Sequence, residues 1–285
     1  MTDISSEPKR TVAIIQARMS ASRLPGKVLH DVAGKPMLAR VVDRTRRAQL
    51  LDQVVVATST DQSDDPIEDF CHQLNYPCFR GSLHDVLDRY YHAAVHFSAG
   101  NIVRITGDCP IIDPILIDQT LLAYFGKGPN LISRNQDIHE RQCIPSDGFS
   151  PAWDFAANRL PPPWKRTFPI GLDTEVCRFS ALEAAWKDAK QSYQREHVMP
   201  YLYEDNHSFQ VLILNHQPDY GELRLTVDTP QDLELLNSIY GHFGTKEDFS
   251  WYDVLDLLRE NPKLLEINAE IDHKDYRDFE TTHRK

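Results

Sequence analysis

The sequence lacks several features that would assign it to a class at once. No run approaches the ~18 apolar residues of a membrane span, and the first ten residues, MTDISSEPKR, contain no apolar stretch of a secretion signal. The five cysteines are an odd number without a C-x-x-C pair, which argues against a disulfide framework and a thiolate zinc site. We therefore expect a cytoplasmic protein with reduced thiols and no membrane contact.

Positive charge is also scarce. Lysine and arginine total 31 against 42 aspartate and glutamate residues, which gives a net charge of −11. Such a surface repels polyanions, so we expect no nucleic acid among the partners. A phosphorylated ligand would need cations that are gathered locally in the fold.

Short β-rich runs alternate with helical patterns over the first 125 residues. The runs include TVAIIQ at 11–16, QVVVATS at 53–59 and NIVRIT at 101–106, and the segments between them repeat apolar residues at helical spacing. Strands that alternate with helices favour a parallel sheet covered on both faces. The sequence therefore predicts an α/β fold.

The pattern changes after about residue 133. Three consecutive prolines at 161–163 exclude a long helix there, and we expect the segment 134–180 to leave the sheet. Aromatic residues gather in this segment. We interpret them as a dimer contact ahead of an acceptor platform or a small local core; they are Trp153, Phe155, Trp164 and Phe168.

Three cations follow the first predicted strand within one loop. In IIQARMSASRLPGK, residues 14–27, Arg18, Arg23 and Lys27 accompany a Pro-Gly pair. Such a loop can direct cations and backbone N–H groups at phosphates beside the carboxyl edge of a parallel sheet. The loop carries neither the P-loop pattern GxxxxGK[ST] nor the dinucleotide pattern GxGxxG. The alternative is that the arginines are ordinary surface residues.

Two aspartates follow short apolar runs and precede turns or helices. Asp108 follows NIVRIT and Gly107, and Asp228 follows LRLTV and precedes Thr229. Both would lie at the carboxyl edge of the sheet, where open α/β sheets bind ligands. Carboxylates with phosphate oxygens suit Mg²⁺. The alternative is that each aspartate only caps the turn or helix after it.

Together these segments resemble the cytidylyltransferases that activate sugars. The matching pieces, in the family's order over roughly residues 11–240, are QARMSASRLPGKVL, GKPML, GSLHDVLDRYYHAA, VRITGDCPIIDP, GLDTEV, ALEAA, REHVMPYLY and LRLTVDTPQDLELL. The resemblance is closest to the spore-coat polysaccharide cytidylyltransferase-like family, which is related to the CMP-3-deoxy-manno-octulosonate and CMP-sialate synthetases.

The resemblance implies a Rossmann-like (GT-A-like) nucleotidyltransferase fold, with a mixed, mostly parallel sheet flanked by helices. We expect a single domain over 1–245, in which 134–180 would protrude and serve dimerisation and acceptor binding. Residues 246–285 would form a C-terminal helical extension. The implied assembly is a homodimer.

The implied activity is a magnesium-dependent transfer of CMP from CTP to a small acidic sugar-like acceptor, with release of pyrophosphate. The residues given a catalytic role are Arg18, Lys27, Asp108 and Asp228, of which Asp108 and Asp228 would hold Mg²⁺. Those expected at the nucleotide are Gln16, Ala17, Arg18, Ser22, Arg23, Lys27, Gly81, Ser82, Asp85, Arg104 and Gly107. Those expected at the acceptor are Glu175, Arg195, Glu196 and His197.

Two other functions stay open on the sequence. One is a nucleotidyltransferase that uses another nucleoside triphosphate with a sugar 1-phosphate. The other is a catalytically silent nucleotide-binding protein. The acceptor is not specified, and Ile170 stands before GLDTEV where an acidic residue is expected from the resemblance, which indicates an atypical acceptor.

Overall fold

The computed structural model describes residues 10–129, 131–132, 151–161, 165–204 and 209–271. A central sheet contains β1 (Thr11–Gln16), β4 (Gln53–Ser59), β5 (Cys78–Gly81), β6 (Asn101–Thr106), β8 (Phe155–Ala157), β9 (Glu175–Arg178) and β10 (Val211–Ile213). The order of these seven strands is β10-β8-β9-β6-β1-β4-β5. β9 is antiparallel to β6 and β8, and the other neighbours in this sheet are parallel. The predicted mixed, mostly parallel sheet is confirmed.

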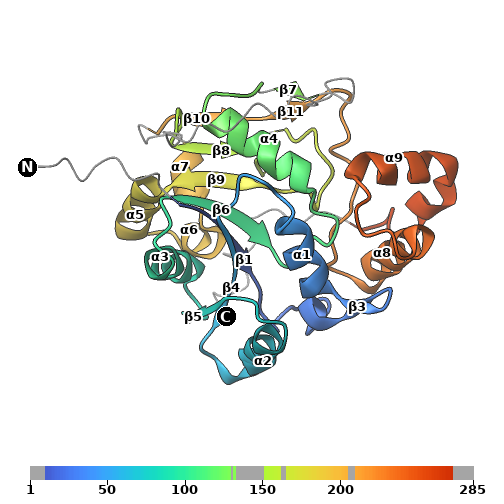
Figure 1. The fold of residues 1–285 in the computed structure, drawn as a ribbon, viewed down its shortest axis with the longest axis horizontal. Helices are drawn as coiled ribbons and strands as arrows, with labels where there is room; N and C mark the ends of the chain where they lie inside the picture. The colour runs from blue at the N-terminus through green and yellow to red at the C-terminus, as the bar shows by residue number, and fades with distance from the viewer. Residues whose placement is uncertain (1–9, 130, 133–150, 162–164, 205–208, 272–285) are drawn as a thin grey trace, which may run out of the picture.

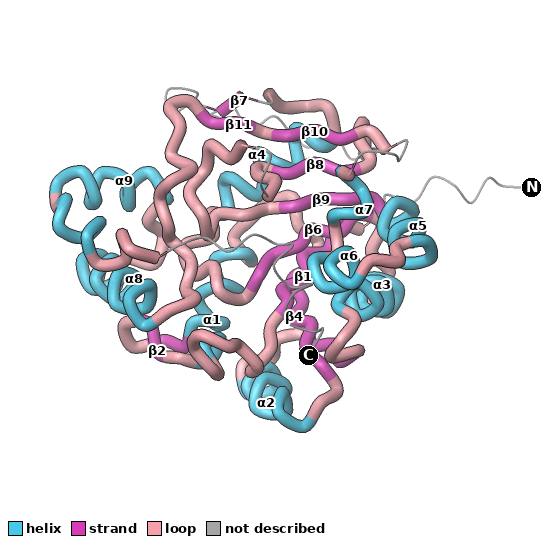
Figure 2. Tube along the Cα trace, turned by 180° about the vertical axis from the view of Figure 1, so that it is seen from behind, coloured by secondary structure: helices cyan, strands magenta, loops and turns pink. Residues whose placement is uncertain are grey.

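Helices cover both faces of the sheet (Figure 1). One face packs against α1 (Met37–Thr45), α2 (Asp65–Gln73), α4 (Pro114–Tyr124), α8 (Pro230–Phe243) and α9 (Trp251–Glu260). The other face packs against α3 (Val86–His96), α5 (Phe179–Asp188) and α7 (Pro200–Tyr203), with α6 (Ser192–His197) lying beside α3. Figure 2 shows the same layers from behind.

Short elements complete the described chain. The strand pairs are β2 (Asp31–Val32) with β3 (Lys35–Pro36), and β7 (Leu131–Ile132) with β11 (Asn215–His216). Three short 3-10 turns are η2 (Lys27–Leu29), η3 (Gln62–Asp64) and η4 (Pro262–Glu266). None of the helices in the described ranges is long and apolar enough to cross a membrane.

Alternation along β1 explains why its residues 12–15 are all apolar. Ala13 and Ile15 belong to the core cluster on one face, whereas Val12 and Ile14 belong to the cluster on the other. A strand that is buried on both faces needs apolar residues at successive positions. The apolar run of β1 therefore places it in the middle of the sheet.

The structure corrects the expectation for the segment 134–180. Residues 133–150 and 162–164 lie outside the described residues, but β8 and β9 are strands of the central sheet rather than parts of a protrusion. Phe155 and Phe168 are fully buried in the two cores, so neither is an exposed dimer contact. A three-residue strand in a proline-rich segment is too short to produce a recognisable periodicity.

The predicted C-terminal extension packs into the domain as far as it is described. Trp251, Val254 and Leu258 of α9 belong to the same core cluster as residues of α4 and α8. α9 begins with a reciprocal cap between Ser250 and Asp253, which stabilises its first turn. The helix after residue 245 is therefore held by burial of its apolar face.

His216 lies at the centre of an aromatic cluster and is only 3% exposed. Its ring contacts Phe168, Tyr220, Trp251 and Tyr252. Nδ1 is 2.7 Å from the carbonyl oxygen of Pro218, and Nε2 is 3.0 Å from the hydroxyl of Tyr252. Burial lowers the pKa of His216, although the Pro218 carbonyl partly opposes this. The folded protein therefore holds this imidazole in its neutral form.

We expect this burial to make stability depend on pH. Near the ordinary histidine pKa of 6.5 the unfolded chain takes up a proton more readily than folded His216 does, so the free energy of unfolding falls as the pH is lowered through that value. The measurement is urea unfolding at pH 7.5 and pH 5.5 for the wild type and for His216→Gln. The variant should be less stable at pH 7.5 and lose less stability on acidification. An equal loss in both proteins would contradict the prediction.

Candidate active site

The strand directions bring several loops to one edge of the sheet. β1, β4, β5 and β6 are parallel, and because β9 is antiparallel to both β6 and β8, β8 runs in the direction of β6. The carboxyl ends of β1, β6 and β8, together with the start of β9, therefore share an edge. Ligands of open α/β sheets bind at this edge.

The cationic loop after β1 is held by buried hydrogen bonds. The carboxylate of Asp64 is fully buried and accepts the N–H of Met19 at 2.7 Å as well as the N–H and hydroxyl of Ser59 at the end of β4. Gly26 has φ +69°, a conformation that favours glycine, and its N–H donates to the carbonyl of Met19 at 2.9 Å. This turn presents Lys27 at the start of η2.

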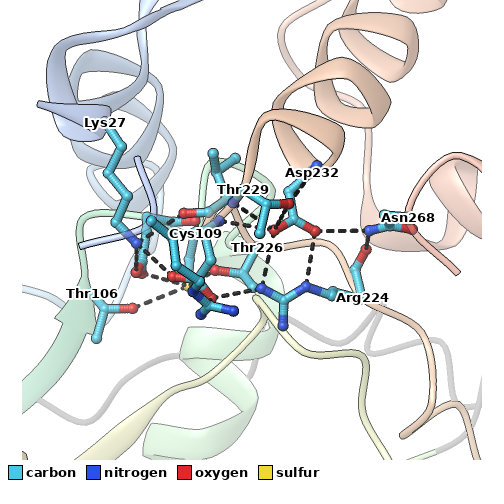
Figure 3. A network of polar contacts seen from close by, with 12 residues as sticks. Lys27, Thr106, Cys109, Arg224, Thr226, Thr229, Asp232 and Asn268 are labelled. Atoms are coloured by element: carbon cyan, nitrogen blue, oxygen red, sulfur yellow. Dashed lines mark hydrogen bonds and ion pairs between the residues drawn. The ribbon is translucent and has the colours of Figure 1, made fainter. Parts of the chain in front are cut away.

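Lys27 connects three segments that are distant in the sequence. Its ammonium lies 2.7 Å from Asp108 Oδ2, 2.7 Å from Asp228 Oδ1 and 2.9 Å from the carbonyl oxygen of Val227. These three acceptors engage all three N–H groups of the ammonium. Figure 3 shows Lys27 at one end of a polar network whose other end is Asn268.

Electrostatics keep Lys27 and Asp228 ionised. Burial alone would lower the pKa of Lys27, but Asp108 and Asp228 outweigh it and the net pKa is raised. Burial alone would raise the pKa of Asp228, but Lys27, Arg224 and Arg23 hold it well below its usual range. Arg23 lies 2.9 Å and Arg224 2.6 Å from Asp228 Oδ2. The aspartate is therefore an anion at neutral pH.

Backbone contacts place Asp108 beside the segment that carries Asp228. The carbonyl of Asp108 accepts the N–H of Val227 at 2.9 Å and the hydroxyl of Thr226 at 3.0 Å. The N–H of Gly107 donates to the carbonyl of Gln16, and a Cβ on Gly107 would come within 2.9 Å of that oxygen. The glycine therefore permits close contact between the ends of β1 and β6.

Two ion pairs involve four of the predicted site residues. Each pair joins a residue predicted at the nucleotide to a residue predicted at the acceptor. Arg18 lies 2.9 Å from Glu196. Arg195 approaches Asp85 through Nε at 2.9 and 3.0 Å and through a terminal nitrogen at 2.6 Å. Asp85 also accepts the N–H of Asp88 as the N-cap of α3. The pairs dock α6 against the start of α3 and the loop after β1.

Three more predicted residues form a chain along the edge. Arg104 of β6 pairs with Glu175 of β9 in a buried contact and donates from Nε to Gln16 Oε1 at 3.1 Å. Burial alone would lower the pKa of Arg104, but Glu175 outweighs it. Glu175 is the first residue of β9 and is buried.

The remaining predicted site residues lie in different environments. Ala17 is buried, and its N–H donates to the carbonyl of Ala57 at 3.1 Å. Ser22 is exposed on the cationic loop, and His197 is the last residue of α6. The carbonyl of Gly81 accepts from Thr60, and the hydroxyl of Ser82 accepts the N–H of Asp85 at 3.1 Å. Gly81 and Ser82 thus shape the loop between β5 and α3.

The structure adds two arginines that the sequence analysis missed. Arg159 follows β8, and its guanidinium lies 3.4 Å from Asp173 and 3.8 Å from Glu175. Its buried Nε has no hydrogen-bond partner among the described residues. Arg166 pairs with the same carboxylate of Asp173. Two guanidiniums thus share Asp173.

These arginines lie near the carboxylate cluster. Burial, Asp108 and Asp173 raise the pKa of Cys109, which follows Asp108 and lies close to Asp173. Three arginines carry positive charge here, namely Arg104, Arg159 and Arg166. Their partners Asp173 and Glu175 carry two negative charges. The edge therefore holds a local cationic excess in an acidic protein. No sequence signal marked these arginines, because their grouping depends on the register of β8 and β9.

Arg89 is a third arginine that the sequence analysis missed. It is only 1% exposed, donates to the carbonyl of Ser82 at 3.2 Å, and leaves Nε without a partner in the described part of the chain. Burial lowers the pKa of Arg89, and the charge of Arg18 lowers it further. Arg89 therefore supports the β5–α3 loop from inside the fold.

The geometry fits a divalent cation that also binds a phosphorylated ligand. Asp108 Oδ2 and Asp228 Oδ1 converge on one cationic group, and their side chains are 24% and 23% exposed. Within the described residues no group of three or more His, Cys, Asp or Glu could hold a metal by itself. Mg²⁺ commonly uses one or two carboxylates and takes its other ligands from phosphate and water.

Comparisons with known proteins point to one enzyme family. The profile of the cytidylyltransferase family matches residues 12–240. An uncharacterized protein of Methanocaldococcus jannaschii is 35% identical over 274 residues, which cover 95% of this chain and 99% of that protein. The spore coat polysaccharide biosynthesis protein SpsF of Bacillus subtilis is 30% identical over 256 residues, which cover 87% of this chain and 94% of SpsF.

Solved structures agree as well. A cytidylyltransferase from Leptospira borgpetersenii has a TM-score of 0.77 at 29% identity, covering 93% of this chain and 100% of that one. A CMP:2-keto-3-deoxy-manno-octonic acid synthetase complexed with CTP shares the fold, with a TM-score of 0.55 at 17% identity over 82% of this chain and 99% of that one. The predicted resemblance and enzyme class are confirmed. Because the family profile covers well over half of the sequence, the chain belongs to the cytidylyltransferase family.

Proposed function

We propose that the protein transfers CMP from CTP to an anionic sugar-like acceptor in a magnesium-dependent reaction that releases pyrophosphate. The observation that carries the proposal is the ammonium of Lys27, which lies between Asp108 and Asp228 beside a loop with two further cations. Triphosphate binding needs such local positive charge, and metal binding needs the two carboxylates.

The reaction needs alignment and charge neutralisation more than proton transfer. An acceptor oxygen attacks the α-phosphorus in line, a new P–O bond forms, and the bond to the β-phosphate breaks so that pyrophosphate leaves with its electron pair. Arg18, Arg23 and Lys27 would neutralise the phosphate oxygens. Asp108 and Asp228 would hold Mg²⁺, which supplies positive charge at the phosphates when it is bound.

The cations reach the phosphates only by exchanging their present partners. Lys27 has committed its three N–H groups to protein oxygens, and Arg18 is paired with Glu196. Negatively charged phosphate oxygens compete for these donors. Arg18 and Arg23 have side chains that are 35% and 31% exposed, so both can turn toward a ligand.

For the base and ribose we propose the region of Gly81, Ser82 and Asp85, with Gln16, Ala17, Ser22, Arg104 and Gly107 lining the rest of the nucleotide site. For the acceptor we propose Glu175, Arg195, Glu196 and His197, to which Arg159 and Arg166 are added. Paired guanidiniums suit a carboxylate or phosphate. A homodimer and a cytoplasmic location stay predictions.

Nucleotide preference tests the donor. With Mg²⁺ present, we expect CTP to raise the melting temperature more than UTP, GTP or dTTP, because a bound ligand stabilises the folded state. The measurement is a thermal-shift panel at equal nucleotide concentrations. Stabilisation by GTP alone would favour the alternative of a sugar 1-phosphate nucleotidyltransferase and overturn the choice of CTP.

Asp108→Asn tests the catalytic carboxylate. The substitution keeps the shape and removes the charge that faces Lys27, so we expect the rate of pyrophosphate release to fall by about 10²–10³. Asp43→Asn is the matched control, because Asp43 also pairs with a lysine, Lys35 at 2.7 Å, outside the proposed site. A wild-type rate in folded Asp108→Asn would remove this residue from the mechanism, whereas absence of pyrophosphate release by the wild type would favour a silent binding protein.

Arg159→Gln tests the acceptor side. Loss of a charge-assisted hydrogen bond should raise KM for an acidic acceptor by about 10- to 100-fold and leave KM for CTP nearly unchanged. Pyrophosphate release is measured with 2-keto-3-deoxy-manno-octonic acid and with sugar phosphates. Arg178→Gln is the control, since Arg178 pairs with Asp154 and is largely exposed. Equal effects on both KM values would place Arg159 outside the acceptor site.

A further inference from the structure

Asp228 uses its two carboxylate oxygens differently. Oδ1 accepts from Lys27 at 2.7 Å, whereas Oδ2 accepts from Arg23 at 2.9 Å and from Arg224 at 2.6 Å. Arg23 lies on the cationic loop with a side chain 31% exposed, but that of Arg224 is 5% exposed. A ligand can draw Arg23 away but cannot reach Arg224. Arg224 is therefore the lasting partner of Oδ2.

A second aspartate holds Arg224 in this position. Asp232 is fully buried, and it accepts Arg224 Nε at 2.8 Å on Oδ1 and a terminal nitrogen of Arg224 at 3.1 Å on Oδ2. Oδ2 also accepts the N–H groups of Asp228 at 2.9 Å and Thr229 at 3.0 Å. One buried carboxylate thus fixes the backbone of Asp228 and the guanidinium that orients its side chain.

The C-terminal segment closes this network, as Figure 3 shows. Asn268 lies beyond η4 and is 7% exposed. Its side-chain Nδ2 donates to Asp232 Oδ1 at 2.9 Å and to the carbonyl of Arg224 at 3.2 Å. A neutral amide binds both groups without adding a charge that would compete for Asp228. The segment 261–271 therefore reaches the candidate active site through one side chain.

The network is not arranged for stability alone. Arg224 leaves its buried NH1 without a hydrogen-bond partner among the described residues, which costs free energy. Apolar residues would fill a purely structural site without that cost. Arg224 does, however, hold a positive charge beside Oδ2 of Asp228, which an apolar residue could not do.

We propose that Arg224, Asp232 and Asn268 are positioning residues for Asp228, so that the C-terminal segment 261–271 completes the active site. Through Arg224, the network fixes Oδ2 of Asp228 and so directs Oδ1 of Asp228 toward Asp108. The ammonium of Lys27 lies between these two aspartates, where a divalent cation would bind. None of the three residues needs to touch the substrate. The inference rests on the proposed function, because Asp228 has its metal-binding role only there.

Asn268→Ala tests the proposal through metal binding rather than activity. We expect the dissociation constant of Mn²⁺, measured by electron paramagnetic resonance with CTP present, to rise about fivefold, while CTP affinity at saturating Mn²⁺ changes less than about twofold. Asn261→Ala is the matched control. It removes an amide from the same segment, where Asn261 Nδ2 donates to the carbonyl of Leu257 at 3.2 Å without touching Asp232.

The outcomes separate this inference from the proposed function. Wild-type Mn²⁺ affinity in Asn268→Ala, or an equal change in Asn261→Ala, would overturn the positioning role and leave the proposed function standing. Absence of Mn²⁺ binding to the wild type with CTP would instead overturn the proposed function and this inference with it. Asp232→Asn adds a second variant, for which we expect a larger rise in the dissociation constant than for Asn268→Ala.

Discussion

The contact of one ammonium with two carboxylates organises the candidate active site of this protein. Lys27 comes from the loop after β1, Asp108 from the end of β6, and Asp228 from the segment before α8. Two carboxylates that approach one cation this closely would repel each other without it. The ion cluster therefore holds three distant segments in one place. Removing these charges from water costs free energy, which an apolar contact between the same segments would not.

The fold supports this cluster through two glycines and a buried aspartate that lie outside it. Gly107 allows the ends of β1 and β6 to meet, and Gly26 gives the turn that precedes Lys27. Buried Asp64 ties the cationic loop to the end of β4. Because helices cover both faces of the sheet, the edge is where strand ends can meet a ligand. Lys27, Arg18 and Arg23 thus lie together at the edge where the proposed reaction would need positive charge.

Ion pairs join the two sides of the edge. Arg18 with Glu196, and Arg104 with Glu175, each connect a residue expected at the nucleotide to one expected at the acceptor. The first pair is partly exposed and can exchange partners, whereas the second is buried and rigid. The buried pair therefore fixes the position of β6 relative to β9, whereas Arg18 is exposed enough to change its partner.

The sequence by itself determined those elements that are specified by residues near one another in the chain. β1, β4 and β6 coincide with their apolar runs, Asp108 and Asp228 follow such runs, and Asp228 precedes the helix cap Thr229. The tertiary structure alone decided that β8 enters the sheet, that Arg159 and Arg166 share Asp173, and that Asn268 reaches Asp232. Periodicity and capping act between residues a few positions apart, whereas these contacts depend on strand register and helix packing across the whole chain.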